Sequence, residues 1–390
     1  MRYYAHNPMV RVIVFLILLL PLAPAHGSPV PWFTSADASV LHRAALLMAH
    51  HSPQSVARLL RRDHAVTSAA VGRDGKTLTL VLPDGVPAAI LPRLSRRATL
   101  VPALRTLARS HAGAGAKAIV LEPFHAELAL PDAEGPNEAA ALRAAGFSVE
   151  TLTDQQVTVQ TMLSLSQYNL VYMLTHSGVN QYGEGLIATG EVANPDPAVK
   201  PYYQDKSVIV TGVAGSTTNY FGVVSEFFAW HSAQFPPDSM VFFDGCSLLH
   251  APLLWNALQS HGVSTMVSWD ADAMSPDEVA AGERFTAAFT SGSSVADSIA
   301  HLAAKGYGQS GVMGITAHVG YLGDGTLRVQ DVLSPHPTPT PLPTLVPTVT
   351  PAVSPTPTPE PAIPSPTART GSGPAWPRLP PLSGVHIPRH

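Results

Sequence analysis

The single cysteine of the chain is the first residue whose chemistry stands out. Cys246 ends the largely apolar run 239–246, and the sequence holds no second cysteine to pair with it. A thiolate is a strong nucleophile, but a free thiol has a pKa of about 8.5, so a neighbouring imidazole is needed to activate it. The plain alternative is a buried cysteine that packs as a small hydrophobic side chain.

His176 is the histidine best placed to supply that imidazole. The chain holds 17 histidines, and this one is set apart because it follows the apolar run 170–174, just as Cys246 follows the run 240–243. The carboxyl ends of parallel strands lie at one edge of a sheet, where ligands bind among the connecting loops. The sequence therefore predicts that His176 and Cys246 meet at that edge as a catalytic dyad.

Three further residues are candidates for a substrate pocket beside the dyad. Asp244 lies two residues before Cys246, and residues two apart on a strand face the same side. A carboxylate there would attract a cationic substrate side chain, unless Asp244 only caps a turn or the next helix. Trp269 and Asp270 end the next predicted strand and are candidates for the pocket wall, although aromatic residues at strand ends usually only pack.

The part of the chain that carries these residues, 116–332, alternates between strand and helix patterns. Strands are predicted at 118–121, 147–152, 170–174, 240–243, 263–269 and 311–319, and helices at 137–145, 222–233, 253–260 and from 275 onward. Strands separated by helices of this length predict an α/β fold with a mostly parallel sheet covered by helices on both faces. A hairpin near 186–192 and a strand at 207–210 are predicted as an inserted flap over the cleft.

A small α+β region is predicted ahead of this domain, at 28–112. Helical patterns at 35–50 and 53–62 are followed by strand patterns at 66–71 and 77–82. The pairs Asp74-Gly75 and Asp84-Gly85 follow the two strand patterns, and Asp-Gly between apolar alternations is a strong hairpin signal. The region is either a propeptide or a plain accessory domain, and its pattern favours neither.

Both ends of the chain have the composition of segments outside a packed domain. Residues 1–25 combine early arginines with the apolar run 12–20 and the small-residue site Ala23-Pro24-Ala25, which predicts a cleaved signal peptide. Residues 333–390 are rich in proline, threonine and serine, which predicts an extended, disordered stalk. We therefore expect a protein that is secreted or held at the cell surface or envelope through its tail.

The composition and charge of the chain limit the classes of partner and cofactor that we expect. The 390 residues are 45% hydrophobic and only 13% charged, with a net charge of −4 and no basic cluster interleaved with aromatic residues, so nucleic acid is not an expected partner. No group of histidine, cysteine and acidic residues has metal-ligand spacing. The predicted chemistry requires no cofactor, and calcium on loop carboxylates is an option that no motif supports.

The order of these motifs carries a resemblance. A strand followed by His, a small residue and Gly, then a strand ending in Asp-x-Cys, then a strand, a long helix and a closing strand, resembles the caspase-like cysteine peptidases. The segment 321–329 is similar to the Gly-Asp-Pro-x-Leu close of gingipain-type domains, and 289–298 is similar to caspase-like domains fused to bacterial repeat proteins. The resemblance spans about 116–332 and is closest to gingipain-type and clostripain-like bacterial members.

The resemblance implies a role for each candidate. His176 would be the general base and Cys246 the nucleophile that forms an acyl-enzyme, with the backbone amides of Cys246 and Ser177 as the oxyanion hole. Most members have glycine directly after the histidine, whereas this chain has Ser177 and then Gly178. In clostripain and the metacaspases the Asp of Asp-x-Cys selects Arg or Lys before the cut bond, which would be the role of Asp244.

Three functions follow as alternatives. The first is an exported cysteine endopeptidase that acts on proteins or peptides, including itself, because arginines that it would recognise stand in or after the first region at 61–62, 93 and 96–97. Self-cleavage there would release an inhibitory segment, unless these arginines are only a solvated surface. The second is a catalytically impaired caspase-like domain that binds or scaffolds at the cell surface. The third, an amidotransferase-like hydrolase, would need small residues on both sides of the nucleophile, but Leu248 stands two after it.

Overall fold

The computed structural model describes residues 32–93, 115–128, 134–312 and 315–334. The predicted signal peptide, the arginine pair 96–97 and the predicted stalk after residue 334 lie outside the described residues. Within the described ranges no helix combines the length and the apolar character needed to cross a membrane.

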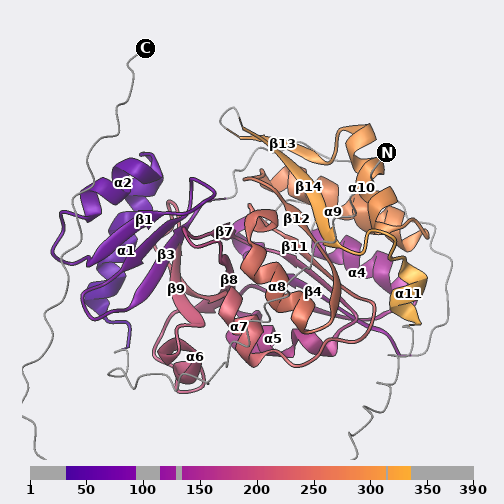
Figure 1. Cartoon of the computed structure of the whole chain (residues 1–390), viewed down its shortest axis with the longest axis horizontal. Helices are drawn as coiled ribbons and strands as arrows, with labels where there is room; N and C mark the ends of the chain where they lie inside the picture. Colours follow the sequence, from indigo (N-terminus) through magenta and orange to yellow (C-terminus); the bar gives the residue numbers. More distant parts are fainter. Residues whose placement is uncertain (1–31, 94–114, 129–133, 313–314, 335–390) are drawn as a thin grey trace, which may run out of the picture. The chain divides into compact units, whose positions relative to one another are not determined.

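The central sheet carries the predicted strands. Its order is β13-β14-β12-β11-β6-β4-β5, and β5, β4, β6, β11 and β12 run parallel, whereas β14 pairs antiparallel with β12 and with β13 (Figure 1). The strands are β4 (Lys117–Glu122), β5 (Ser148–Thr153), β6 (Leu170–Leu174), β11 (Ser239–Asp244), β12 (Val263–Trp269), β13 (Gln309–Val312) and β14 (Ile315–Gly323). The sheet therefore places the ends of β6 and β11 side by side.

Helices bury both faces of this sheet. On one face lie α4 (Glu134–Ala145), α9 (Ser275–Thr290) and α10 (Val295–Lys305), and on the other α5 (Val159–Ser164), α7 (Ser225–His231) and α8 (Pro252–Ser260). Along β11 the side chains alternate between the two cores, with Met240 and Phe242 on the α9 side and Val241 and Phe243 on the α8 side. Burial on both faces explains why these strands read as continuous apolar runs.

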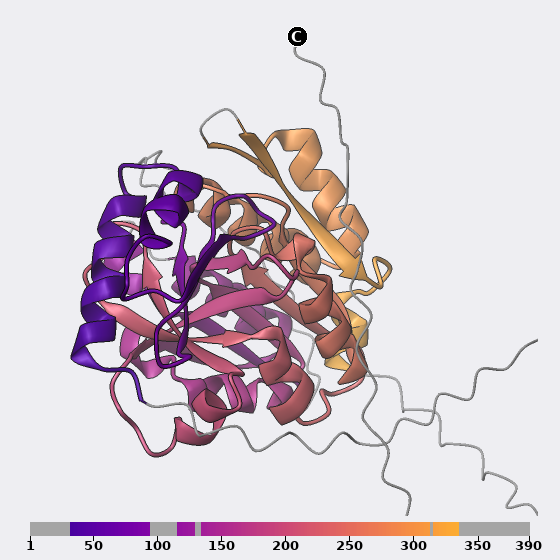
Figure 2. The ribbon, with the colours of Figure 1, turned by 60° about the vertical axis from the view of Figure 1, so that its left-hand side comes forward.

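A second mixed sheet joins the first predicted region to the interval between His176 and Cys246. Its order is β1-β2-β3-β9-β10-β8-β7, and β3 pairs in parallel with β9. The strands are β1 (Ser68–Val71), β2 (Leu78–Val81), β3 (Pro87–Leu91), β7 (Ser177–Val179), β8 (Gly185–Val192), β9 (Val208–Val213) and β10 (Asn219–Val224). The helices α1 (Ser35–Met48) and α2 (Pro53–Leu60) pack beside β3 and β1 (Figure 2). The region predicted at 28–112 thus shares a sheet and a core with the predicted flap.

These two sheets correct part of the predicted fold. The α/β class is confirmed, but the strands form two mixed sheets where we expected one mostly parallel sheet. The predicted helix 222–233 is strand β10 followed by α7, because β10 hydrogen-bonds to β8 on one side and β9 on the other. The predicted hairpin at 186–192 is the single strand β8, and the predicted last strand is the pair β13 and β14.

Hydrogen bonds of the turn between β1 and β2 connect the first region to β7. Asp74 accepts hydrogen bonds from the Lys76 and Thr77 amides, both at 2.9 Å, and from the Val179 amide of β7 at 3.0 Å. Gly75 completes the turn with a positive φ of 74°, which glycine adopts without steric cost. The turn therefore holds Lys76 close to β7, which follows His176 directly.

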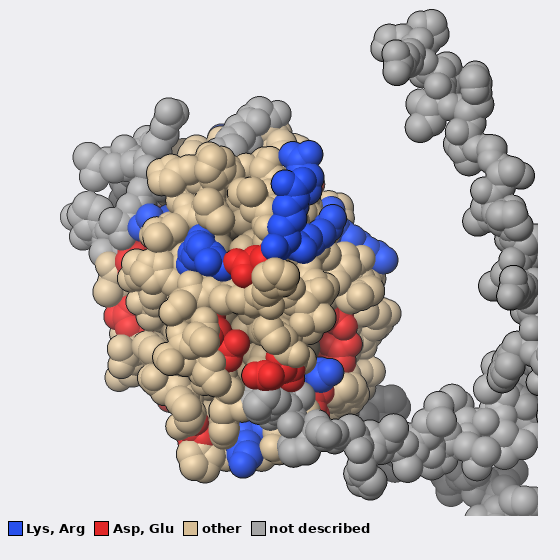
Figure 3. Space-filling model, turned by 90° about the vertical axis from the view of Figure 1, so that its left-hand side faces the viewer, with Lys and Arg blue, Asp and Glu red and all other residues tan. Residues whose placement is uncertain are grey.

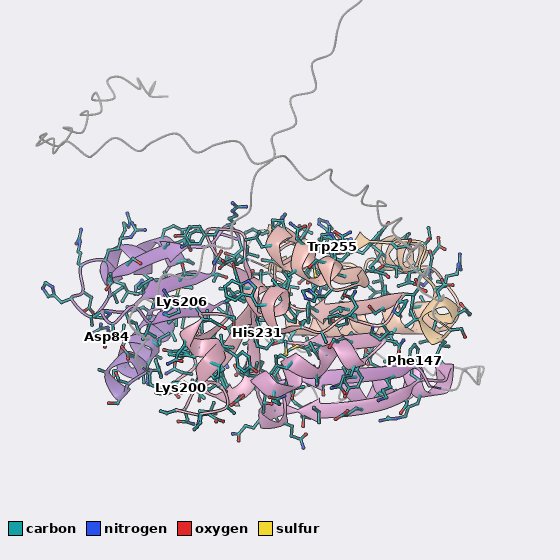
Figure 4. All side chains as sticks on the ribbon, turned by 60° about the horizontal axis from the view of Figure 1, so that its bottom comes forward. Asp84, Phe147, Lys200, Lys206, His231 and Trp255 are labelled. Atoms are coloured by element: carbon teal, nitrogen blue, oxygen red, sulfur yellow. The ribbon has the colours of Figure 1, made fainter. Side chains whose placement is uncertain are left out.

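Two surface features complete the description. His231, at the end of α7, pairs at 2.9 Å with Asp205, which follows α6 (Lys200–Gln204), in the part of the molecule where Lys206 and His231 are labelled (Figure 4). On the face presented by the first region, several Lys and Arg side chains gather in the upper part of the view, with an acidic side chain against them and further acidic side chains below (Figure 3).

Candidate active site

His176 lies at the carboxyl end of β6 and is fully buried. Its ring meets Phe124 edge to face at 4.6 Å between centroids, and Nε2 lies 3.9 Å from Oε1 of Glu127, on α3 (His125–Leu128). Neither ring nitrogen has a hydrogen-bond partner in the part of the chain that the structure describes. A buried imidazole without hydrogen-bond partners is uncommon in proteins.

The surroundings of His176 keep its ring neutral. Burial lowers the pKa of His176 to about 3, and the Arg93 guanidinium lowers it as well. The Pro92 carbonyl faces the ring outside hydrogen-bonding geometry and opposes the fall in pKa. Arg93 is itself 3.5 Å from Glu127, measured from Nε to Oε1. The end of the first region thus lies against the predicted general base.

Cys246 follows β11 and is also buried, with 1% of its surface exposed. Burial raises the pKa of the thiol well above its usual value, and the carboxylates of Asp272 and Glu278 add to the rise. A hydrogen bond from the Ala273 backbone and the Lys76 ammonium act in the opposite direction. Since neither ring nitrogen of His176 has a partner, the structure holds a protonated thiol and a neutral imidazole that are not hydrogen-bonded to each other.

The two residues nevertheless stand at the ends of adjacent strands. β6 and β11 are parallel neighbours, with Leu174 opposite Asp244, and the Thr175 amide donates to the Asp244 carbonyl at 3.0 Å. His176 and Cys246 therefore follow the carboxyl ends of two neighbouring parallel strands. Within the described residues, no hydrogen bond joins their two side chains.

The Ser177 side chain links the segments that follow β6 and β11. Its hydroxyl donates to the Cys246 carbonyl at 2.9 Å, and a Cβ added to Gly245 would meet that hydroxyl at 2.5 Å and the Thr175 carbonyl at 2.6 Å. Ser247, the residue after Cys246, adopts a left-handed φ of 66° although it is not glycine. Such backbone strain gathers at functional sites. The serine after His176 thus acts through its side chain as a structural link.

We expect Ser177→Ala to lower the free energy of unfolding by about 1–2 kcal/mol, because the buried Cys246 carbonyl would lose its side-chain donor. Gly245→Ala should cost more, since its new methyl group would collide with backbone as well as side chain. Chemical denaturation of the two variants and of the parent measures both effects. A Ser177→Ala variant as stable as the parent would contradict the link assigned to the hydroxyl.

Asp244 and Trp269 come together, as predicted, and Tyr172 joins them. Asp244 is fully buried, and its two carboxylate oxygens accept from the Tyr172 hydroxyl and from Nε1 of Trp269, both at 2.6 Å. Both donors lie on strands adjacent to β11. Tyr172 has no sequence signal of its own, because an aromatic residue within an apolar strand usually only packs.

Asp270 makes its contacts with another element. One carboxylate oxygen accepts from the His318 amide of β14 at 2.7 Å, and the other lies 3.4 Å from Nδ1 of the same residue. Its side chain is more than a third exposed, whereas Trp269 is fully buried. Of the two residues predicted as pocket wall, the structure places Trp269 against Asp244 and pairs Asp270 with β14.

Two buried carboxyl groups near Asp244 were missed by the sequence analysis. Glu138 of α4 and Glu278 of α9 are 1% and 0% exposed, and none of their four carboxyl oxygens has a hydrogen-bond partner among the described residues. Burial raises the pKa of both well above the usual value, and the negative charge of Asp244 adds to each rise. In the sequence, both residues read as ordinary polar positions of a solvated helix.

The first region also reaches the surroundings of Cys246 through Lys76. Lys76 Nζ lies 2.8 Å from Oδ2 of Asp272, whose Oδ1 accepts from the Ser247 hydroxyl at 3.3 Å. Asp272 is in turn one of the charges that act on the Cys246 thiol. Lys76 on one side and Arg93 on the other therefore bring the first region to the surroundings of both predicted catalytic residues.

A cleft of about 830 Å³ opens beside His176. Phe124 and Glu127, the two residues in contact with the imidazole, form part of its wall, together with Asp154, Gly190 and Tyr220. A substrate chain lying in this cleft would reach His176 only past Phe124 and Glu127. The described residues contain no group of three or more His, Cys, Asp or Glu side chains suited to a metal ion.

Comparisons with protein-family models and with curated proteins found no match in either set. The assignment of a function therefore depends on the residues of the site and on their geometry.

Proposed function

We propose that the chain is a secreted cysteine endopeptidase that cuts peptide bonds after Arg or Lys, with Cys246 as nucleophile and His176 as general base. The observation that carries this proposal is the placement of the two residues at the carboxyl ends of the adjacent parallel strands β6 and β11. The resemblance to caspase-like peptidases assigns them the same roles. Export through residues 1–25 and attachment through the tail 333–390 belong to the same proposal.

The chemistry follows from the two groups. In the active state His176 accepts the thiol proton, and the thiolate attacks the carbonyl carbon of the scissile bond. The backbone amides of Cys246 and Ser177 stabilise the oxyanion of the tetrahedral intermediate. Its collapse breaks the C–N bond, and the imidazolium gives its proton to the leaving amine. Water, deprotonated by His176, then hydrolyses the thioester and restores the free thiol.

The closed arrangement supports a latent form of this enzyme. A peptide cannot reach residues that are 0% and 1% exposed, and a neutral imidazole with a depressed pKa is a weak base for a thiol whose pKa is raised. The first region supplies Arg93 beside His176 and Lys76 beside Asp272. We therefore propose that cleavage after the arginines at 93 or 96–97 releases the region as an inhibitory segment.

A second candidate function is supported by the same burial. A domain of this kind that binds a partner without cutting it needs no contact between His176 and Cys246, and the structure shows no hydrogen bond between them. In that case the covered site would be permanent, and the tail 333–390 would serve to display the domain.

The test is an assay of the full chain with matched reporter peptides that end in Arg, Lys, Asp or Asn. Sequencing the N-terminus of any processed form shows whether the chain is cut after the arginines at 93 or 96–97. We expect turnover of the Arg and Lys peptides by the processed form. Turnover confined to Asp or Asn peptides would contradict the preference assigned to Asp244, and no turnover by either form would favour the binding protein.

A further inference from the structure

The buried carboxyl groups of Glu138 and Glu278 have no explanation in the packing of the fold. A buried polar atom without a hydrogen bond costs about 1–3 kcal/mol, more when the group is charged, and folded proteins leave few such atoms. Here four oxygens lack partners within the same region of the described chain. Such a group is expected where a ligand supplies the missing hydrogen bonds.

Neighbouring carboxyl groups do have partners. Glu122 accepts from the Gly135 amide at 2.8 Å, Glu283 accepts from the Asn137 side chain at 2.6 Å, and Asp277 accepts from the Ser310 hydroxyl at 2.6 Å. The missing partners are therefore not a general feature of the acidic residues on α4 and α9. Among the described acidic side chains of these two helices, they are found at Glu138 and Glu278.

The position of these two residues connects them to the proposed active site. α4 and α9 pack against each other on the same face of the central sheet (Figure 1). The carboxyl group of Glu278 is close enough to act on both the Cys246 thiol and the Asp244 carboxylate, and that of Glu138 acts on Asp244. The two carboxyl groups thus lie around Asp244, two residues from the nucleophile.

The chemistry of this set indicates a cationic ligand with several donors. Carboxylates only accept hydrogen bonds, and bringing them together without a cation is costly because like charges repel in a medium of low dielectric constant. A guanidinium group offers five N–H donors in a plane and binds carboxylates through paired hydrogen bonds, whereas an ammonium offers three. An arginine side chain fits the set best.

We propose that Glu138 and Glu278, together with Asp244, hold the side chain of the substrate residue that precedes the cut bond, and that this residue is arginine. The proposal rests on the proposed peptidase function and adds two residues to the specificity pocket. Glu138 and Glu278 form its inner part, on α4 and α9, while Asp244 lies closer to the nucleophile along the chain.

Substrate binding at this pocket is coupled to proton release. Without a cation, burial and the surrounding charges raise the pKa of both carboxyl groups and so favour their protonated forms. The charged groups that act on them are Asp244, Glu122 and Glu283 for Glu138, and Asp244, Asp272 and Asp277 for Glu278. A bound guanidinium favours the ionised carboxylates, so the KM for an arginine peptide should fall as the pH rises.

The experiment compares an arginine reporter peptide with its citrulline counterpart, which has nearly the same shape but no charge. In the processed chain, we expect Glu138→Gln and Glu278→Gln each to lower the ratio of kcat/KM for arginine over citrulline by about 10- to 100-fold. The pH dependence of the arginine KM should also weaken. Asp297→Asn is the control, because it removes one carboxylate from an exposed position on α10, away from both glutamates, and should leave the ratio unchanged.

Binding of benzamidine, an aromatic amidine, to the parent chain in its processed form, or in its full form where no processing occurs, gives a second readout. We expect benzamidine to raise its unfolding temperature, and Glu138→Gln or Glu278→Gln to abolish that rise. Each glutamine variant must first show a parent-like unfolding transition, which the near-identical shape of the amide favours. Arginine cleavage with an unchanged arginine-to-citrulline ratio overturns the pocket and leaves the peptidase standing. Benzamidine binding that is lost in the variants, without any cleavage, supports the pocket and overturns the peptidase. If neither cleavage nor benzamidine binding is observed, both the pocket and the peptidase are overturned.

Discussion

Replacement of Cys246 by alanine should lower the hydrolysis of an arginine reporter peptide to at least about 10³-fold below that of the processed parent chain. The sequence contains no other thiol that could replace the nucleophile, so the residual rate should be close to that of the buffer. The same variant should fail to process itself after the arginines at 93 or 96–97. Kinetic traces and N-terminal sequencing measure the two effects separately.

The control for this experiment is a second histidine. His176→Ala should lose activity to a similar extent, because the thiol then has no base, whereas His231→Ala should keep it, since His231 pairs with Asp205 at the end of α7. Hydrolysis that survives in Cys246→Ala would reject the nucleophile. Full activity in His176→Ala together with a dead Cys246→Ala would keep the thiol and reject the base.

The central sheet was the most predictable part of the fold. β12 is found at Val263–Trp269 and β6 at Leu170–Leu174, the ranges predicted from the sequence. β6 is buried and apolar at every position, and β12 carries four apolar residues among seven, which include both of its ends, so the ends of both strands are marked in the sequence. The strand ends that carry His176 and Cys246 could be located for the same reason.

The second sheet was not predictable in the same way. β3 pairs with β9 more than a hundred residues later, and such a pairing leaves no trace in a local pattern. The segment that forms β10 and α7 reads as one helix, because its aromatic and small residues also match a helical repeat. Only the neighbouring strands β8 and β9, which hydrogen-bond to both edges of β10, determine the strand.

The residues of the candidate site also differ in whether they could be predicted from the sequence. The positions of His176, Cys246 and Asp244 follow from strand ends and from the two-residue period of a strand. Glu138 and Glu278 lie on helices, where a glutamate normally faces solvent, and their burial depends on how α4 and α9 pack. Tertiary packing of this kind can be recognised only in the folded chain.

Replacement of Lys76 by methionine should strongly lower the free energy of unfolding. The ion pair of Lys76 with Asp272 is mostly buried, with side-chain exposures of 19% and 8%, so Lys76→Met would leave a buried carboxylate without its cation. Removing one partner of a buried pair costs about 3–5 kcal/mol, and the partial exposure of Lys76 reduces this to about 2–3 kcal/mol. Chemical denaturation of the full chain measures the loss.

The double variant Lys76→Met with Asp272→Asn tests what causes the loss of stability in Lys76→Met. If the loss comes from the unpaired carboxylate, the double variant should recover at least half of the stability, because the uncharged amide tolerates burial better. Arg73→Met is the matched control on the same hairpin. Arg73 donates to the Gln181 carbonyl at 3.2 Å from an exposed position, so its loss should cost less than about 0.5 kcal/mol.

The rate of Cys246 alkylation in the Lys76→Met variant tests whether the first region is an inhibitory cover or a structural part of the fold. If the first region is an inhibitory cover, Lys76→Met should expose Cys246 and speed its alkylation by iodoacetamide at least about tenfold, since buried thiols react only after opening. Arg73→Met should leave the alkylation rate unchanged. A Lys76→Met chain that loses stability without faster alkylation would show that the hairpin unfolds only with the whole domain. The first region would then be a structural part of the fold that no cleavage could release.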